Sequence, residues 1–153
     1  WEDCDLYRIA ENAVDSLMTT AETENVKLDL SGSHAMVYGV PQQLYSIVYN
    51  LCDNAIRYNN KGGSVTISVM PVDNQIVLSV KDTGIGISKE HQERIFERFY
   101  RVDKSHSREI GGTGLGLAIT RNSILMHRGA IKVHSVLGEG TTFDVRIPLN
   151  YIA

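Results

Sequence analysis

The sequence has few of the residues that build disulfides, zinc sites or nucleic-acid surfaces. Of its 153 residues only two are cysteines, Cys4 and Cys52, and they do not form a Cys-x-x-Cys pair. We expect both to be buried small hydrophobic side chains in a reducing compartment. The five histidines lack His-x-x-x-His spacing, which argues against zinc. The formal net charge of -3 argues against a nucleic-acid surface.

Long hydrophobic runs are absent as well. No stretch approaches the roughly 20 apolar residues of a membrane span, and residues 1–5 do not resemble a signal peptide. Because the chain does not begin with Met, we expect it to be a piece of a longer protein. The 42% hydrophobic and 22% charged residues are typical of a globular protein, so we predict a single domain over residues 1–153.

The hydrophobic periodicity predicts both helices and strands. Helical spacing of apolar residues predicts helices over residues 6–24, 41–60, 91–98 and 115–127. Alternation of apolar and polar residues predicts strands over residues 26–30, 35–38, 64–69, 76–82, 131–136 and 142–149. Since several strand pairs are joined by short turns, we predict an α+β two-layer sandwich. Its sheet would be mixed and mostly antiparallel, with three main helices on one face.

A carboxylate follows the strand over residues 76–82 on its inward side. Asp82 continues the series Ile76, Leu78 and Val80, so the period of two directs it toward the core. A buried carboxylate needs a partner, and the glycines that follow allow a ligand to approach closely. An adenine amino group could donate to Asp82, whereas guanine presents a carbonyl there. The alternative is an Asp that only forms a turn at the strand end.

Three polar residues share one face of the helix over residues 41–60. Asn50, Asn54 and Arg57 are spaced i, i+4 and i+7, opposite the apolar stripe and beside Asp53. Their amides suit a hard cation such as Mg²⁺ that keeps water and phosphate oxygens as its other ligands. The alternative is an ordinary solvated helix face.

A glycine-rich turn runs directly into the helix over residues 115–127. In Gly111-Gly112-Thr113-Gly114-Leu115-Gly116-Leu117, backbone N–H groups at the helix start would favour phosphate oxygens. The alternative is a flexible linker. The preceding segment carries cations that could close on a triphosphate as a flexible lid, or could be ordinary solvated loop charges: Arg98, Arg101, Lys104 and Arg108.

Taken together, these segments resemble the ATP-binding catalytic domain of sensor histidine kinases. The resemblance covers essentially the whole chain and rests on five motifs that look like the family's N box, first glycine box, F box, second glycine box and final Gly-Thr-Phe segment. They lie at Asn50–Tyr58, Asp82–Ile87, Phe96–Arg101, Gly112–Leu117 and Gly138–Phe143. The family implies the Bergerat fold, and residues 1–5 would then connect to a dimerisation domain that carries the acceptor histidine. Phe99–Ser105 resembles the phosphate-sensing and cell-wall-sensing branch.

The resemblance implies a role for each matching residue. Asn54 would bind Mg²⁺, Asn50 would support the same site, and Asp82 would bind the adenine amino group. Other residues would contact the nucleotide's base, nucleoside or phosphates: Arg57, Tyr58, Gly84, Gly86, Ile87, Arg101, Lys104, Gly112, Thr113, Gly114, Leu115, Gly116 and Leu117, with Thr142 behind the adenine. Of these, Arg101 and Lys104 would reach the terminal phosphate and act with Asn50 in catalysis.

Two departures bear on activity. ATPases of this fold carry a Glu where this chain has Asn50, and an amide cannot act as a base, so we expect only weak ATP hydrolysis by the chain alone. The family's acceptor motif is absent, so we expect the chain not to phosphorylate itself. We predict a cytoplasmic histidine kinase domain of a dimeric, membrane-bound sensor that acts with a response regulator, while the piece itself is monomeric. Alternatives are an ATPase of this fold, a nucleotide-free pseudokinase and a serine kinase of the anti-sigma type.

A smaller departure lies at Val40, before Pro41, where many relatives carry an Asp cap. Its absence would destabilise the helix start by about 1 kcal/mol at most.

Overall fold

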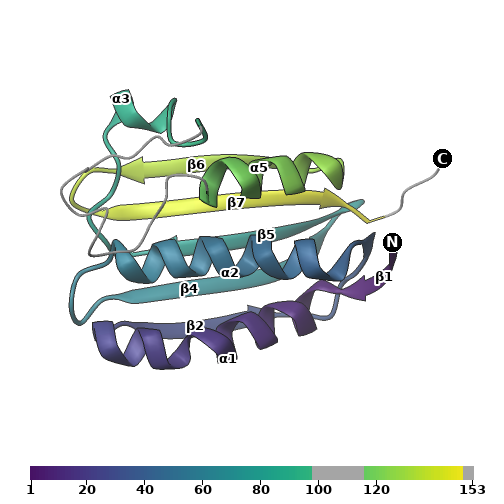
Figure 1. Ribbon diagram of the computed structural model, residues 1–153, viewed down its shortest axis with the longest axis horizontal. Coiled ribbons are helices and arrows are strands. Elements are labelled where there is room, and N and C mark those ends of the chain that lie inside the picture. The colour runs from purple at the N-terminus through teal and green to yellow at the C-terminus, as the bar shows by residue number, and fades with distance from the viewer. Residues whose placement is uncertain (98–115, 150–153) are drawn as a thin grey trace.

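The computed structural model describes residues 1–97 and 116–149, and the architecture below refers to these residues. Three helices lie over one face of a five-stranded sheet, so the protein is a two-layer α+β sandwich (Figure 1). The helices over the sheet are α1 (Leu6–Glu24), α2 (Pro41–Arg57) and α5 (Gly116–Met126), and a short α3 spans Lys89–Gln92. The strands are β1 (Glu2–Asp5), β2 (Lys27–Gly32), β3 (Met36–Gly39), β4 (Ser64–Val72), β5 (Gln75–Asp82), β6 (Ala130–Val136) and β7 (Gly140–Pro148).

The large sheet is mixed, as predicted. Its strand order is β2-β4-β5-β7-β6, in which only β2 and β4 run parallel. The hairpin between β4 and β5 turns at Asp73, whose φ of 57° is one that Asp and Asn tolerate better than most residues. Because β5 lies at the centre of the sheet, the end of β5 lies inside the fold and not at an edge.

The core lies between the helices and the inner face of the sheet. Along β4 and β5 the buried residues alternate with more exposed ones, and the alternation extends to Asp82. On α2 the buried residues follow the predicted helical stripe, from Leu44 to Ile56. Fully burying a Leu or Ile contributes about 1.5–3 kcal/mol, so this stripe holds α2 against the sheet and fixes which face it turns away.

The start of α2 is tied to the end of α5. Val40 has no side-chain cap, as the sequence indicated, and its backbone N–H donates to Nε2 of His127 at 3.1 Å. The imidazole Nδ1 therefore carries the hydrogen and donates to the Ser123 carbonyl at 2.7 Å. Trp1 stacks on this buried imidazole, with ring centroids 5.0 Å apart. The N-terminal residue is thereby packed against the junction of the two helices.

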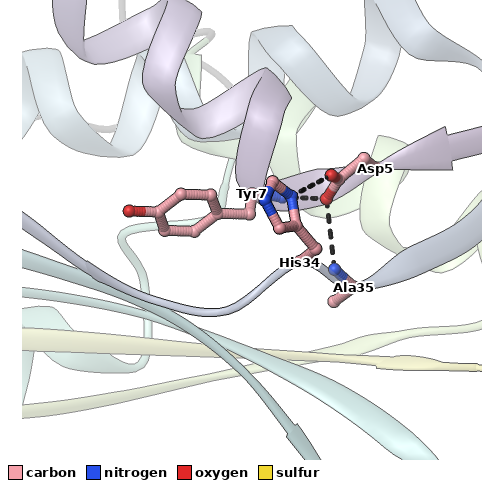
Figure 2. A network of polar contacts seen from close by, with 4 residues as sticks. All are labelled: Asp5, Tyr7, His34 and Ala35. Atoms are coloured by element: carbon pink, nitrogen blue, oxygen red, sulfur yellow. Dashed lines mark hydrogen bonds and ion pairs between the residues drawn. The ribbon is translucent and has the colours of Figure 1, made fainter.

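The N-terminal segment forms a strand that the sequence did not predict. β1 pairs antiparallel with β3 in a separate two-stranded sheet. Asp5 then caps α1, because its Oδ1 accepts from the N–H groups of Tyr7 and Ala35, each at 3.1 Å, and its Oδ2 pairs with Nδ1 of His34 (Figure 2). Burial opposes ionisation of this carboxyl, but the bonds from Ala35, His34 and Tyr7 hold its pKa below the usual value. Residues 1–5 are thus an integrated part of the described structure.

Other differences from the predicted elements are small. The helix expected over residues 91–98 is shorter and earlier, because α3 ends at Gln92 and a turn follows to Glu97. The helix expected to reach residue 60 ends at Arg57, where Tyr58 takes the C-cap position. Within the described ranges, none of the helices has the length and apolar character needed to span a bilayer.

Candidate functional site

Asp82 lies where the sequence placed it, on the inner face at the end of β5. Asp82 is only 7% exposed to solvent. Oδ1 accepts backbone N–H groups from Gly84 at 2.9 Å and from Thr141 at 3.1 Å. Burial raises the pKa of this carboxyl, while the two N–H bonds oppose the rise. Both bonds go to Oδ1, so within the described part of the chain Oδ2 has no hydrogen-bond donor and can accept one from a ligand.

The residue of β7 that contacts Asp82 is Thr141, one position before the expected Thr142. Thr142 is opposite Lys81 in the β5–β7 register and therefore lies on the other face of the sheet from Asp82. Thr141 is buried, and its hydroxyl lies 2.8 Å from the hydroxyl of Ser135. A strand reverses its face at every residue, so the one-residue offset decides which Thr can reach the site.

The segment after Asp82 is held between α2 and the β6–β7 turn. The N–H of Ile85 donates to the Tyr58 carbonyl at 3.2 Å, and the N–H of Ile87 donates to Oγ of Ser135 at 2.7 Å. Gly86 has a φ of 74°, and a Cβ built there would lie 2.2 Å from the Val136 carbonyl oxygen. The glycine is therefore required by the backbone itself. It allows the loop to lie against the end of β6.

Gly84 is constrained by space. A Cβ there would lie 2.4 Å from the Tyr58 carbonyl oxygen and 3.0 Å from Oδ1 of Asp82. The end of α2 and the end of β5 thus approach each other as closely as their backbones allow. This contact brings the polar face of α2 and the Asp82 carboxyl to the same end of the molecule.

The polar face of α2 contains the predicted residues, all of them half-buried. Asn50 donates through Nδ2 to Oγ1 of Thr120 on α5 at 3.3 Å. Arg57 forms an ion pair with Asp53, one turn earlier, with Nε and Oδ1 2.9 Å apart. Arg57 therefore has an acidic partner on its own helix, and contact with a nucleotide would require it to share or exchange that partner.

This arrangement fits magnesium and an adenine nucleotide in the chemistry of its donors. The amide oxygens of Asn50 and Asn54 are neutral, hard donors, of the kind that would suit Mg²⁺ whose other ligands are water and phosphate oxygens. The Asp82 carboxylate retains an acceptor oxygen beside glycines that expose backbone. These features suit a ligand that carries an amino group at one end and anionic oxygens at the other.

Several predicted residues lie outside the described part of the chain. They are the lid cations and most of the second glycine segment: Arg98, Arg101, Lys104, Arg108, Gly112, Thr113, Gly114 and Leu115. Gly116 begins α5, and Leu117 packs partly buried against the core. Sequence reasoning missed Thr120, Ser135 and Thr141. Of these three, only Thr141 could have been found from the sequence, because it lies in the same Gly138–Phe143 motif as the predicted Thr142.

Comparisons with known proteins agree with this geometry. The sequence model of the family described as histidine kinase-, DNA gyrase B-, and HSP90-like ATPase matches residues 39–151. The chain is 40% identical over 151 residues to the sensor histidine kinase RppB of Synechocystis sp., covering 97% of the chain and 33% of RppB. It is 40% identical over 145 residues to the sensor-like histidine kinase SenX3 of Mycolicibacterium smegmatis, covering 94% of the chain and 38% of SenX3.

The fold agrees with a solved structure of the same class. The mycobacterial sensor histidine kinase MprB superposes with a TM-score of 0.85 at 25% identity, and the match covers 99% of both chains. The chain spans about a third of the length of the curated relatives it matches.

Proposed function

The chain belongs to the histidine kinase-, DNA gyrase B-, and HSP90-like ATPase family as the ATP-binding catalytic domain of a sensor histidine kinase, and on this premise we propose that it holds Mg-ATP and transfers the γ-phosphoryl group to a histidine on a separate dimerisation domain. The parent would be a dimeric membrane sensor that passes the phosphoryl group to a response regulator. Relatives about three times as long as the chain support a parent with further domains.

The observation that carries the proposal is the environment of Asp82. Its Oδ1 is anchored by the N–H groups of Gly84 and Thr141, so the carboxylate cannot rotate freely. Its Oδ2 would accept the amino group of adenine, whereas the carbonyl of guanine would face a carboxylate oxygen and be repelled. Burial strengthens both effects, because a charge interacts more strongly where water is excluded. Asp82 would therefore select adenine over guanine.

The polar face of α2 would serve the phosphate end of the nucleotide. Asn54 would be a magnesium ligand and Asn50 would support it, with Arg57 and Tyr58 contacting the phosphates or the nucleoside. Magnesium would neutralise the charge that develops on the phosphoryl oxygens. We assign the remaining contacts to Arg101, Lys104 and the backbone of residues 112–117, with Arg101 and Lys104 at the terminal phosphate.

The proposal includes a limit on what this chain does alone. Asn50 has no lone pair of suitable basicity to activate water, so the chain would hydrolyse ATP slowly. The general base would come from beside the acceptor histidine on the partner domain. Catalysis by this chain would consist of positioning and charge neutralisation.

The test is phosphoryl transfer to a supplied acceptor. The chain is incubated with [γ-³²P]ATP, Mg²⁺ and a dimerisation domain from a close relative, beside the same domain with its acceptor His replaced by Ala. We expect label on the intact acceptor only, stable in base and lost in acid, as for phosphohistidine. Acid-stable label would indicate a serine kinase instead. Rapid phosphate release without any acceptor would favour an ATPase.

A further inference from the structure

Thr120 is a hydroxyl at a position where an apolar side chain would be expected. Thr120 lies on the face of α5 that packs on α2, in the same buried stripe as Ile124 and His127. Thr120 is only 1% exposed to solvent. A hydroxyl buried this deeply destabilises the fold unless it is hydrogen-bonded. Its described side-chain partner is Nδ2 of Asn50, 3.3 Å from Oγ1. The buried hydroxyl is therefore matched to a residue of the proposed magnesium and phosphate site.

The bond is made by the nitrogen end of the Asn50 amide, which turns the oxygen end away from Thr120. With Nδ2 donating to Thr120, the carbonyl oxygen Oδ1 is left as an acceptor, and no donor within residues 1–97 and 116–149 lies at hydrogen-bond distance from it. Asn54 lies one turn further along α2, on the same face. Without Thr120, the half-buried amide could rotate and present its NH₂ group, which carries partial positive charge and cannot bind a cation.

We propose that Thr120 is a positioning residue: its hydroxyl holds the Asn50 amide with the oxygen available to the magnesium and phosphate end of the nucleotide. The inference rests on the proposed function. It also links two elements of the site, since α5 begins directly after the glycine segment while α2 carries Asn50 and Asn54. A shift of α5 against α2 would then change the orientation of the Asn50 amide at the metal end of the site through this one side-chain hydrogen bond.

The experiment measures how much Mg²⁺ improves ADP affinity, by calorimetry with and without the metal. Thr120→Val keeps the side-chain shape and removes the hydroxyl. Thr120→Ser keeps the hydroxyl. Ile124→Val is the matched control, because it trims a fully buried residue one turn along the same helix without touching a polar group.

We expect Thr120→Val to bind ADP without Mg²⁺ as the wild type does and to lose about fivefold of the magnesium enhancement, the equivalent of one ordinary hydrogen bond. Thr120→Ser should keep the enhancement within about twofold. Ile124→Val should lower the unfolding midpoint and leave the enhancement unchanged. Wild-type enhancement in Thr120→Val, or an equal loss in Ile124→Val, would overturn the inference.

A second measurement needs neither nucleotide nor a folded Thr120→Val chain. In ¹⁵N NMR spectra of the wild type, the side-chain NH₂ protons of Asn50 should exchange with water more slowly than those of Asn54. Equal exchange rates would contradict the hydrogen bond itself. If the wild type binds no ADP, the proposed function fails, and the positioning role fails with it. If the wild type binds Mg-ADP but Thr120→Val and Thr120→Ser show the same magnesium enhancement, the positioning role fails while the proposed function stands.

Discussion

Replacing Asp82 with Asn should separate nucleotide binding from stability. The two side chains have nearly the same shape, and an Asn oxygen can accept the N–H groups of Gly84 and Thr141 as Oδ1 of Asp82 does. The Asn NH₂ group then takes the position of Oδ2. The flipped amide orientation is disfavoured, because it would place the NH₂ group against two backbone N–H groups, which are also donors. We therefore expect the fold to persist with a donor where the adenine amino group needs an acceptor.

The loss of affinity can be approximated from this geometry. A hydrogen bond to a charged group contributes about 1.5–3 kcal/mol, and an unsatisfied buried donor costs about 1–3 kcal/mol. A net loss of about 3 kcal/mol corresponds to a roughly 100-fold weaker Kd for ADP. Calorimetry with ADP and Mg²⁺ measures it directly, with Asp29→Asn as the control, since that Asp is exposed on β2 at the far edge of the sheet.

Stability should move in the opposite direction from affinity. The pKa of Asp82 is raised above its ordinary value of 3.8 by burial. A raised pKa means that the folded state favours the protonated carboxyl, so stability is lost as the pH rises through the folded pKa. At pH 7, above the ordinary pKa of a carboxyl, Asp82 therefore opposes folding, and Asp82→Asn should be at least as resistant to urea as the wild type.

This stability difference should narrow as the pH is lowered toward 3.8. ADP affinity within about threefold of the wild type, in a folded Asp82→Asn chain, would refute the assignment of Asp82 to adenine.

Three further outcomes are expected. Asp5→Ala should lower the free energy of unfolding by about 1–2 kcal/mol at pH 7, and because the pKa of Asp5 is held below 3.8, the difference should fade in urea titrations as the pH falls below that value. Gly86→Ala should destabilise the fold by about 1–3 kcal/mol in thermal unfolding, because its φ of 74° and the nearby Val136 carbonyl leave no room for a methyl group; an unchanged midpoint would contradict this. Burial raises the pKa of Cys52 to about 12, so its thiol should react with a disulfide reagent at pH 8 only after unfolding, and fast labelling of the folded chain would be the contrary result.

The local patterns of the sequence determined most of the architecture. The apolar stripe of α2 and the alternation along β4 and β5 could be read directly, because burial of one face imposes a period of 3.6 or 2. The period of two along β5 also predicted that Asp82 faces the core, without any knowledge of its hydrogen-bond partners. These features depend on residues within one or two turns of each other, and a single sequence contains that information.

The strand β1 and the face of Thr141 required the tertiary structure. Glu2–Asp5 has little preference for a strand by itself and becomes one by pairing with β3, more than thirty residues away. Thr141 and Thr142 are equivalent in composition, and only the register of β7 against β5 shows which of them faces Asp82. Register is decided by pairing across strands, which no local pattern records.

The side-chain contacts of the site were decided in the same way. Thr141 meets Asp82 across 59 residues of chain, Thr120 meets Asn50 across 70, and His127 meets Val40 across 87. The sequence determined that polar groups would stand on the face of α2 and at the end of β5, because hydrophobic burial leaves them no other place. It did not determine which partners hold them, because a hydrogen bond needs atoms within about 3 Å in the right orientation. That proximity arises only when α5 and β7 pack beside α2 and β5.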